Sequence, residues 1–260
     1  MGNRTTYADT LHQAGRRAKA QAQFAEAEAL QAGRQPQLPL LYALQGFRYC
    51  DLLLGDAERA SWVRLLGVDG QRSPALERAL EACRAVSNRA SRTAEWMESD
   101  PNAPVLTVAV EHLTLARAAT YHAILSGDSP PNERLKRAIH FLHRASDQAH
   151  VPSGLLTRAL WRAVTGDFDG GREDLDEAFE IAERGPMRLH LADIHLHRAR
   201  LFGLIAKRPA AYPWDSARDD LDAARKLIDE CGYGRRREEL EDAEAAWVRL
   251  HGTSAPRVAN

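Results

Sequence analysis

Residues 11–20 read LHQAGRRAKA and lead into Phe24 and Ala27. After Gly15, a small residue follows five positions later, a large apolar residue nine positions later and another small residue twelve positions later. Glycine favours the end of one helix. The small residues let two antiparallel helices approach closely, and the large residue fills the gap between them. The stretch therefore predicts a helical hairpin.

Two patterns of this kind recur along the chain. The offsets of the first stretch return at Gly166, where Gly171, Leu175 and Ala178 follow at the corresponding positions. A second pattern, His-Leu-x-x-Ala-Arg, occurs at residues 112–117 and again 83 residues further on. That separation is about two units of roughly forty residues, as expected for a helical repeat.

The rest of the chain predicts helices almost throughout. All twelve prolines lie at the edges of segments rich in alanine, leucine, arginine and glutamate. Proline suits the first turn of a helix and breaks its interior. No segment alternates apolar and polar residues in the way of a strand. We expect about twelve helices, at residues 4–14, 17–32, 38–54, 56–66, 74–99, 104–126, 131–149, 152–165, 168–184, 187–206, 214–231 and 235–250.

Composition excludes several protein classes. The 260 residues carry a formal net charge of −1, so no overall field favours nucleic acid or an acidic membrane. No apolar run approaches the roughly 20 residues of a membrane span, and the first residues show no signal segment. The three cysteines lie far apart and are expected to be free thiols. We expect a cytoplasmic protein.

Five stretches carry a resemblance to a known family. They are GFRYCD at 46–51, EHLTL at 111–115, GLL at 154–156, MRLHLADIHL at 187–196 and GYGRR at 232–236. With the repeat offsets, they resemble divergent bacterial tetratricopeptide-repeat (TPR) proteins, including modules attached to signal-transduction NTPases. The resemblance implies an all-α, superhelical α-solenoid of stacked antiparallel helix pairs that binds a partner protein or peptide on its concave face.

We expect a single domain over residues 1–260. It contains an atypical loop at 61–74 and ends in a capping helix at 235–250. Trp62, in the atypical loop, is the best candidate for an exposed anchor. The run Arg235–Arg237 is followed at once by acidic residues, so we expect a helix with opposite charges four positions apart.

Two helices carry histidines and carboxylates in metal-ligand patterns. His190, Asp193 and His197 share one helical face, and so do His140, His143, Asp147 and His150. Imidazole and carboxylate groups could bind Zn²⁺ or another transition metal. A polar stripe without metal is the simpler interpretation of both faces, so we assign no metal site.

Arginines in the first helices of the pairs suggest a second kind of site. Arg158 and Arg162 lie one turn apart, and Asp193 in the next first helix is expected to pair with one of them. A row of arginines could instead bind a carboxylate-bearing peptide. The residues expected to line such a groove are Arg48, Glu111, His112, Arg117, Arg158, Arg162, Asp193, His197 and Arg200.

The sequence therefore favours a non-catalytic interaction module. It contains no phosphate-binding loop, dinucleotide fingerprint or nucleophile elbow. We predict no enzymatic activity, no cofactor, a protein or peptide partner, no nucleic-acid or membrane partner, and possible self-association through the open ends of the helix stack. Two alternatives stay open: a sensor region of a larger signalling ATPase, and a metal-binding protein or metalloenzyme centred on His190, Asp193 and His197.

Overall fold

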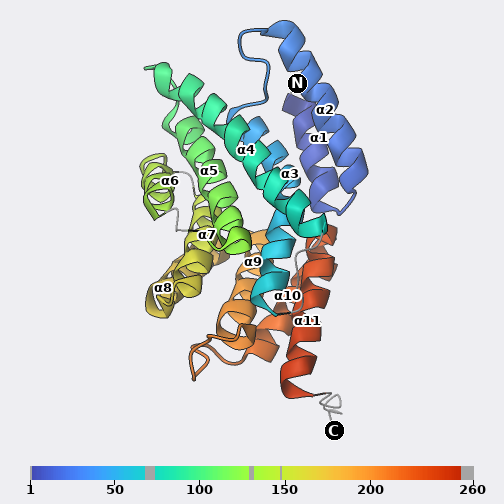
Figure 1. The fold of residues 1–260 in the computed structure, drawn as a ribbon, viewed down its shortest axis with the longest axis vertical. Helices are drawn as coiled ribbons and strands as arrows, with labels where there is room; N and C mark the ends of the chain where they lie inside the picture. Colours follow the sequence, from blue (N-terminus) through green and yellow to red (C-terminus); the bar gives the residue numbers. More distant parts are fainter. Residues whose placement is uncertain (1, 68–73, 129–131, 147, 253–260) are drawn as a thin grey trace.

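The computed structural model describes residues 2–67, 74–128, 132–146 and 148–252. This part of the chain is built from helices and contains no strand (Figure 1). The α-helices are α1 (Gly2–Gln13), α2 (Arg17–Arg34), α3 (Ala43–Leu65), α4 (Pro74–Ser99), α5 (Val105–Ser126), α6 (Asn132–Arg144), α7 (Val151–Val164), α8 (Phe168–Arg184), α9 (Arg188–Arg198), α10 (Ala217–Cys231) and α11 (Arg237–His251). A π-helical turn, η1 (Ala199–Leu204), extends α9, and a 3-10 turn, η2 (Gly234–Arg236), precedes α11.

The predicted all-α class is confirmed, with one clear error in the helix boundaries. Two helices were expected at 38–54 and 56–66, but α3 runs unbroken through Gly55. An interior glycine costs a helix only about 1 kcal/mol. The buried side chains of Leu52, Leu54 and Trp62 on both sides of it outweigh that cost.

The atypical loop expected at 61–74 is shorter than predicted. Residues 61–65 complete α3, and residues 68–73 lie outside the described part of the chain. Trp62 was expected to be an exposed anchor, but only 1% of its surface is accessible. It packs inside the main core, to which Leu54 and Ala57 of α3 also belong.

Consecutive helices form hairpins: α1 pairs with α2, α3 with α4, α5 with α6, α7 with α8, and α9 with α10 (Figure 1). The first helices of these hairpins also contact one another in chain order, from α1 through α3, α5 and α7 to α9. The small residues have the expected role. A Cβ on Gly171 would lie 3.3 Å from the carbonyl oxygen of Ala159 in the paired helix.

The end of the chain returns to its beginning. A Cβ on Gly234 of η2 would lie 2.5 Å from the carbonyl oxygen of Ala14, just after α1. Helix α11 lies beside α3, where Arg59 contacts Asp242 at 2.8 Å. Figure 1 shows the red α11 beside the cyan end of α3 and below the blue α1 and α2. The stack of hairpins therefore curves so that η2 contacts α1 and α11 contacts α3.

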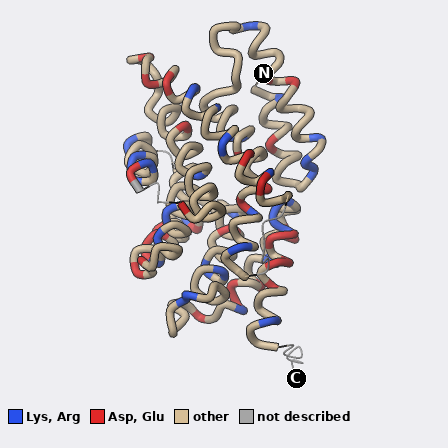
Figure 2. The backbone as a smooth tube through the Cα atoms, viewed as in Figure 1, with Lys and Arg blue, Asp and Glu red and all other residues tan. Residues whose placement is uncertain are grey.

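Charges on the helices are mixed in sign. Figure 2 shows basic and acidic residues interleaved along the tube, in keeping with a net charge of −1. Among the described helices, none is both long enough and apolar enough to cross a bilayer.

Candidate binding site

The inner faces of the first helices converge on one polar cavity of about 120 Å³. Its lining comes from α3, α5, α7, α9 and η2 together with their flanking residues. The hairpin stack thus brings into contact residues that lie almost 190 positions apart in the sequence. The residues around the cavity are Phe47, Asp51, Glu58, Arg117, Tyr121, Ser153, Leu156, Thr157, Leu160, Leu189, His190, Asp193, His197, Tyr233, Arg235 and Arg236.

Helix α3 supplies two buried carboxylates to this cavity. Asp51 and Glu58 lie seven residues apart, so they project from the same face two turns from each other. Arg117 on α5 binds both of them, with its Nη2 atom 2.7 Å from Asp51 Oδ1 and 3.5 Å from Glu58 Oε2. All three side chains are buried, so each charge depends on its neighbours for compensation.

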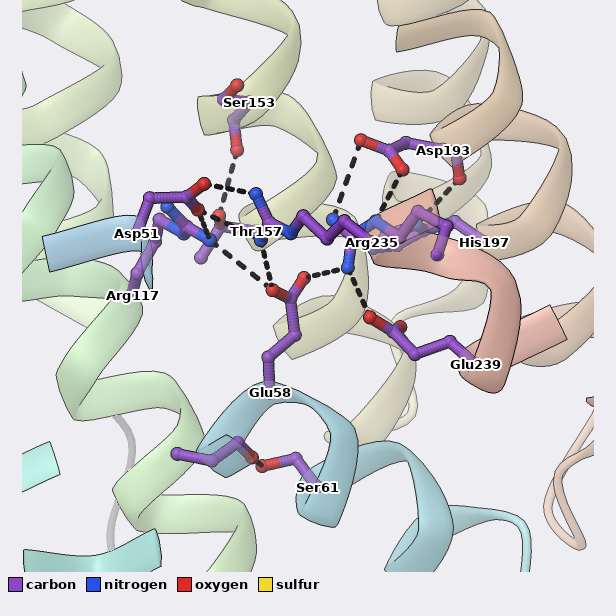
Figure 3. Close-up of polar contacts among 12 residues, drawn as sticks. Asp51, Glu58, Ser61, Arg117, Ser153, Thr157, Asp193, His197, Arg235 and Glu239 are labelled. Atoms are coloured by element: carbon purple, nitrogen blue, oxygen red, sulfur yellow. Dashed lines mark hydrogen bonds and ion pairs between the residues drawn. The ribbon is translucent and has the colours of Figure 1, made fainter. Parts of the chain in front are cut away.

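The turn η2 adds two more guanidinium groups, those of Arg235 and Arg236. Figure 3 shows Arg235 extending between Asp51 and Glu58. Arg235 donates from Nη2 to Asp51 Oδ1 at 2.9 Å and to Glu58 Oε2 at 2.7 Å. Arg236 contacts Glu58 through Nη1 at 2.9 Å and donates from Nε to Asp193 Oδ1 at 2.7 Å. The turn therefore links α3 to α9 through charge-assisted hydrogen bonds, which are the strong class of such bonds.

Glu239 and Arg200 extend the network towards the C-terminal helix. Arg236 donates to Glu239 Oε1 at 2.5 Å, and Arg200 on η1 donates to Glu239 Oε2 at 3.0 Å. Arg200 is almost fully buried and stacks over the Trp62 ring, 4.6 Å from its centroid. Tyr233 donates its hydroxyl to Asp193 at 3.1 Å. We call this set the central network: Asp51, Glu58, Arg117, Asp193, Arg200, Tyr233, Arg235, Arg236 and Glu239.

Neighbouring arginines lower the pKa of two carboxylates in the central network, Asp51 and Glu58. Burial opposes ionisation of Asp51, but Arg235 and Arg117 hold its pKa well below the usual range. Burial likewise opposes ionisation of Glu58, and Arg236, Arg235 and Arg117 lower its pKa. Carboxyl groups held in this way are weak bases, so they are suited to binding cations rather than to accepting protons.

The histidines near the cavity are neutral at pH 7. Burial, reinforced by Arg200, lowers the pKa of His197 to about 4. Burial also lowers the pKa of His190 and, together with Arg235, that of His12. The four carboxylates and four guanidiniums of the central network therefore balance one another without a contribution from histidine.

The structure brings four of the nine predicted groove residues to this region. Arg117, Asp193 and Arg200 belong to the central network, and His197 lines the cavity, where its Nδ1 atom lies 2.8 Å from the Asp193 carbonyl oxygen. Arg48 lies apart from them, near α1, with its Nε atom 3.4 Å from Asp9. Arg117, Asp193 and Arg200 thus form ion pairs with other side chains of the same protein.

Glu111 and His112 lie away from the cavity and face different neighbours. Glu111 accepts hydrogen bonds from the Thr93 hydroxyl at 2.6 Å and the Ala43 N–H at 2.7 Å. His112 stacks on Phe141 and contacts Glu98 at 3.0 Å. Adjacent residues on a helix point in different directions, as these two do.

The expected ion pair between Asp193 and Arg158 or Arg162 is wrong. Arg158 donates from Nε to Asp174 Oδ1 at 2.9 Å, and Arg162 lies 2.9 Å from the same oxygen. Asp174 belongs to α8, the second helix of the same hairpin. The charges of both arginines are therefore balanced by Asp174 within their own hairpin. Asp193 instead pairs with Arg236 of the η2 turn.

Neither metal-ligand pattern forms a cluster in the described part of the chain, where no group of three histidine, cysteine or acidic side chains is arranged to hold an ion. The His190 Nε2 atom lies 3.3 Å from the Ser153 hydroxyl. In the other pattern, His143 contacts Glu177 at 3.8 Å and His140 makes an edge-to-face contact with Phe141. Asp147 lies outside the described residues.

Arg235 and Arg236 are the functional candidates that the sequence analysis missed. The capping helix expected at 235–250 begins only at Arg237, whose side chain is 60% exposed, whereas the side chains of Arg235 and Arg236 are 8% and 6% exposed. The signal was the preceding Gly232-Tyr233-Gly234. It ends α10 and places the two arginines in a short turn directly before α11, and such a turn can enter a crowded interior.

Comparison with known proteins does not add a relative. No protein-family model matches the chain, and no curated protein or solved structure is significantly similar to it.

Proposed function

We propose that this protein is a non-catalytic interaction module that binds a partner protein or peptide on the inner face of its hairpin stack. The observation that carries the proposal is the convergence of α3, α5, α7 and α9 on one polar cavity. Helical-repeat proteins bind their partners on extended concave surfaces of this kind.

The hairpin order supports a TPR-like solenoid as the architecture of this module. First helices contact first helices in chain order, and small residues sit at the hairpin interfaces. Contacts in an ideal open solenoid are limited to neighbouring repeats. Here α11 also reaches α3, so we propose a short solenoid closed by its C-terminal segment, acting in the cytoplasm.

Leu189 offers a direct test, because it lines the cavity and is only partly buried. A charge placed there should disturb a ligand at the mouth of the cavity without entering the central network. Leu30 on α2 is 44% exposed and is not among the cavity-lining residues, so Leu30→Glu is a matched control with the same change in charge.

The measurement is co-purification from native lysate with quantitative mass spectrometry, after circular dichroism shows equal helicity. We expect a partner that is retained by the parent and by Leu30→Glu and is lost by Leu189→Glu. A partner retained equally by all three chains would rule out the inner face as the binding surface.

A further inference from the structure

We infer that the η2 turn occupies the inner face as a built-in ligand, and that the partner binds there through its own pair of consecutive arginines. This inference rests on the proposed function and specifies its site, partner chemistry and regulation. The occupant of the site is a short segment, Tyr233–Arg236, held on carboxylates from α3 and α9.

The first argument is charge. Without Arg235 and Arg236, the described residues around the cavity include three carboxylates, Asp51, Glu58 and Asp193, against the single guanidinium of Arg117. An uncompensated charge in a buried site is strongly unfavourable. Any segment that displaces the turn must therefore bring its own cations.

The second argument is geometry. Arg235 faces Asp51 and Glu58, while Arg236 faces Glu58 and Asp193, so adjacent residues reach carboxylates on two different helices. Guanidinium groups suit this arrangement better than ammonium groups, because their planar fork donates to two carboxylates at once. Arg236 also contacts Glu239 three residues later. A partner segment of the form Arg-Arg-x-x-Glu at the start of a helix has the same chemistry.

The third argument is that the chain allows the segment to move off the inner face. It lies directly before α11, the last described helix, and Gly232, in a left-handed conformation, separates it from α10. The contacts of α11 with the body combine three buried apolar residues, Leu240, Ala243 and Ala246, with ion pairs near the surface. The ion pairs join Arg59 to Glu238 and Arg225 to Glu244. Exposed pairs of this kind contribute little to stability.

Gly234→Ala tests the inference without altering any charged group. Its Cβ would lie 2.5 Å from the Ala14 carbonyl oxygen, so the turn has to move while the carboxylates of α3 and α9 stay in place. Gly33→Ala on the exposed side of α2 is the control, because a Cβ there has nothing within 4 Å. Both variants are made in the full chain.

The probe is a fluorescent peptide with the sequence of residues 230–251, measured by anisotropy. A tethered segment competes at an effective concentration near the millimolar range. We therefore expect Gly234→Ala to bind the probe at least tenfold more tightly than the parent or Gly33→Ala does. A peptide with both arginines replaced by alanine should not bind. A folded Gly234→Ala that binds neither peptide, or binds both equally, would overturn the inference.

If Gly234→Ala does not fold, hydrogen exchange of the parent chain tests whether the η2 turn opens from the inner face. Amides of residues 232–240 should exchange at least tenfold faster than those of α3 and α9. Equal protection would show that the turn opens only on global unfolding and is a structural lock. A partner that is lost by Leu189→Glu but lacks an arginine pair would sink this inference and leave the proposed function standing.

Discussion

Glu111 on α5 is a buried carboxyl group outside the central network whose acidity differs from that of a free side chain. Burial raises its pKa to about 7, although the hydrogen bonds from Thr93 and Ala43 and the charge of Arg89 favour its ionised form. It accepts the first N–H of α3 at Ala43, a non-glycine residue with a φ of 54°. A side chain on α5 therefore helps to fix the start of α3.

This environment predicts a distinctive pH dependence. The pKa of Glu111 is raised from 4.5 to about 7, so the folded state holds its proton more tightly than the unfolded state does. Its contribution to stability is fully present below pH 4.5 and is lost as the pH rises through 7. The loss at pH 8 is about 3 kcal/mol by linkage.

Glu111→Gln should remove this dependence. The amide oxygen can still accept from Ala43, and the amide N–H can donate to the Thr93 hydroxyl, which also reaches the Ala90 carbonyl at 3.2 Å. Urea unfolding measured from pH 4.5 to 8 gives the free energy of unfolding of both chains. As the pH rises, this free energy should increase in the variant relative to the parent by up to about 3 kcal/mol. Parallel stability curves would contradict the assignment, since all other titrating groups are common to both chains.

At the scale of single elements, α3 is the helix on which the site depends. It carries Asp51 and Glu58, receives η2 and α11 on the same side, and contacts both α1 and α5. Its interior glycine, Gly55, has no atom within 4 Å of the position that a Cβ would occupy. Packing therefore does not require glycine at this position.

Gly55→Ala should stabilise the protein. Alanine removes the entropic cost of glycine in a helix interior, worth about 1 kcal/mol, and meets no steric obstacle. Chemical denaturation should show a higher midpoint with an unchanged slope. A lower midpoint would mean that the open space beside Gly55 is filled in solution, for example by ordered water that alanine displaces.

At the scale of the whole molecule, the C-terminal segment closes the stack. Gly15 and Gly234 come so close that a Cβ on Gly15 would lie 2.9 Å from the Gly234 backbone. The ion pairs of Arg235 and Arg236 with the carboxylates of α3 join residues about 180 positions apart. Such contacts tie the unfolding of the N-terminal hairpins to that of the C-terminal hairpin.

Arg236→Ala should therefore destabilise the entire chain. It leaves Asp193 and Glu58 short of a cation in a buried site, which typically costs 3–5 kcal/mol, so we expect a loss of about that size. Arg237→Ala is the control, because its side chain is 60% exposed and should change stability by less than about 0.5 kcal/mol. Thermal unfolding followed by far-UV dichroism compares the two. Equal midpoints would show that the central network contributes little.

The sequence alone determined the helical class and much of the hairpin arrangement, because these follow from local rules. Proline positions marked helix ends, and the spacing from Gly166 through Gly171 to Ala178 placed small residues at a hairpin interface. Local rules also produced the error at Gly55, where burial on both sides outweighed the weak preference of glycine to break a helix.

Tertiary structure alone decided the pairing of charges. Arg117, Asp193 and Arg200 were recognised as candidates for one site, but their partners come from α3, η2 and α11, and sequence spacing cannot show these contacts. Arg158 forms its ion pair with Asp174 of its own hairpin and not with the predicted Asp193. The physical reason is that a buried ion must find the nearest opposite charge after packing, and that neighbour depends on how the chain curves back on itself.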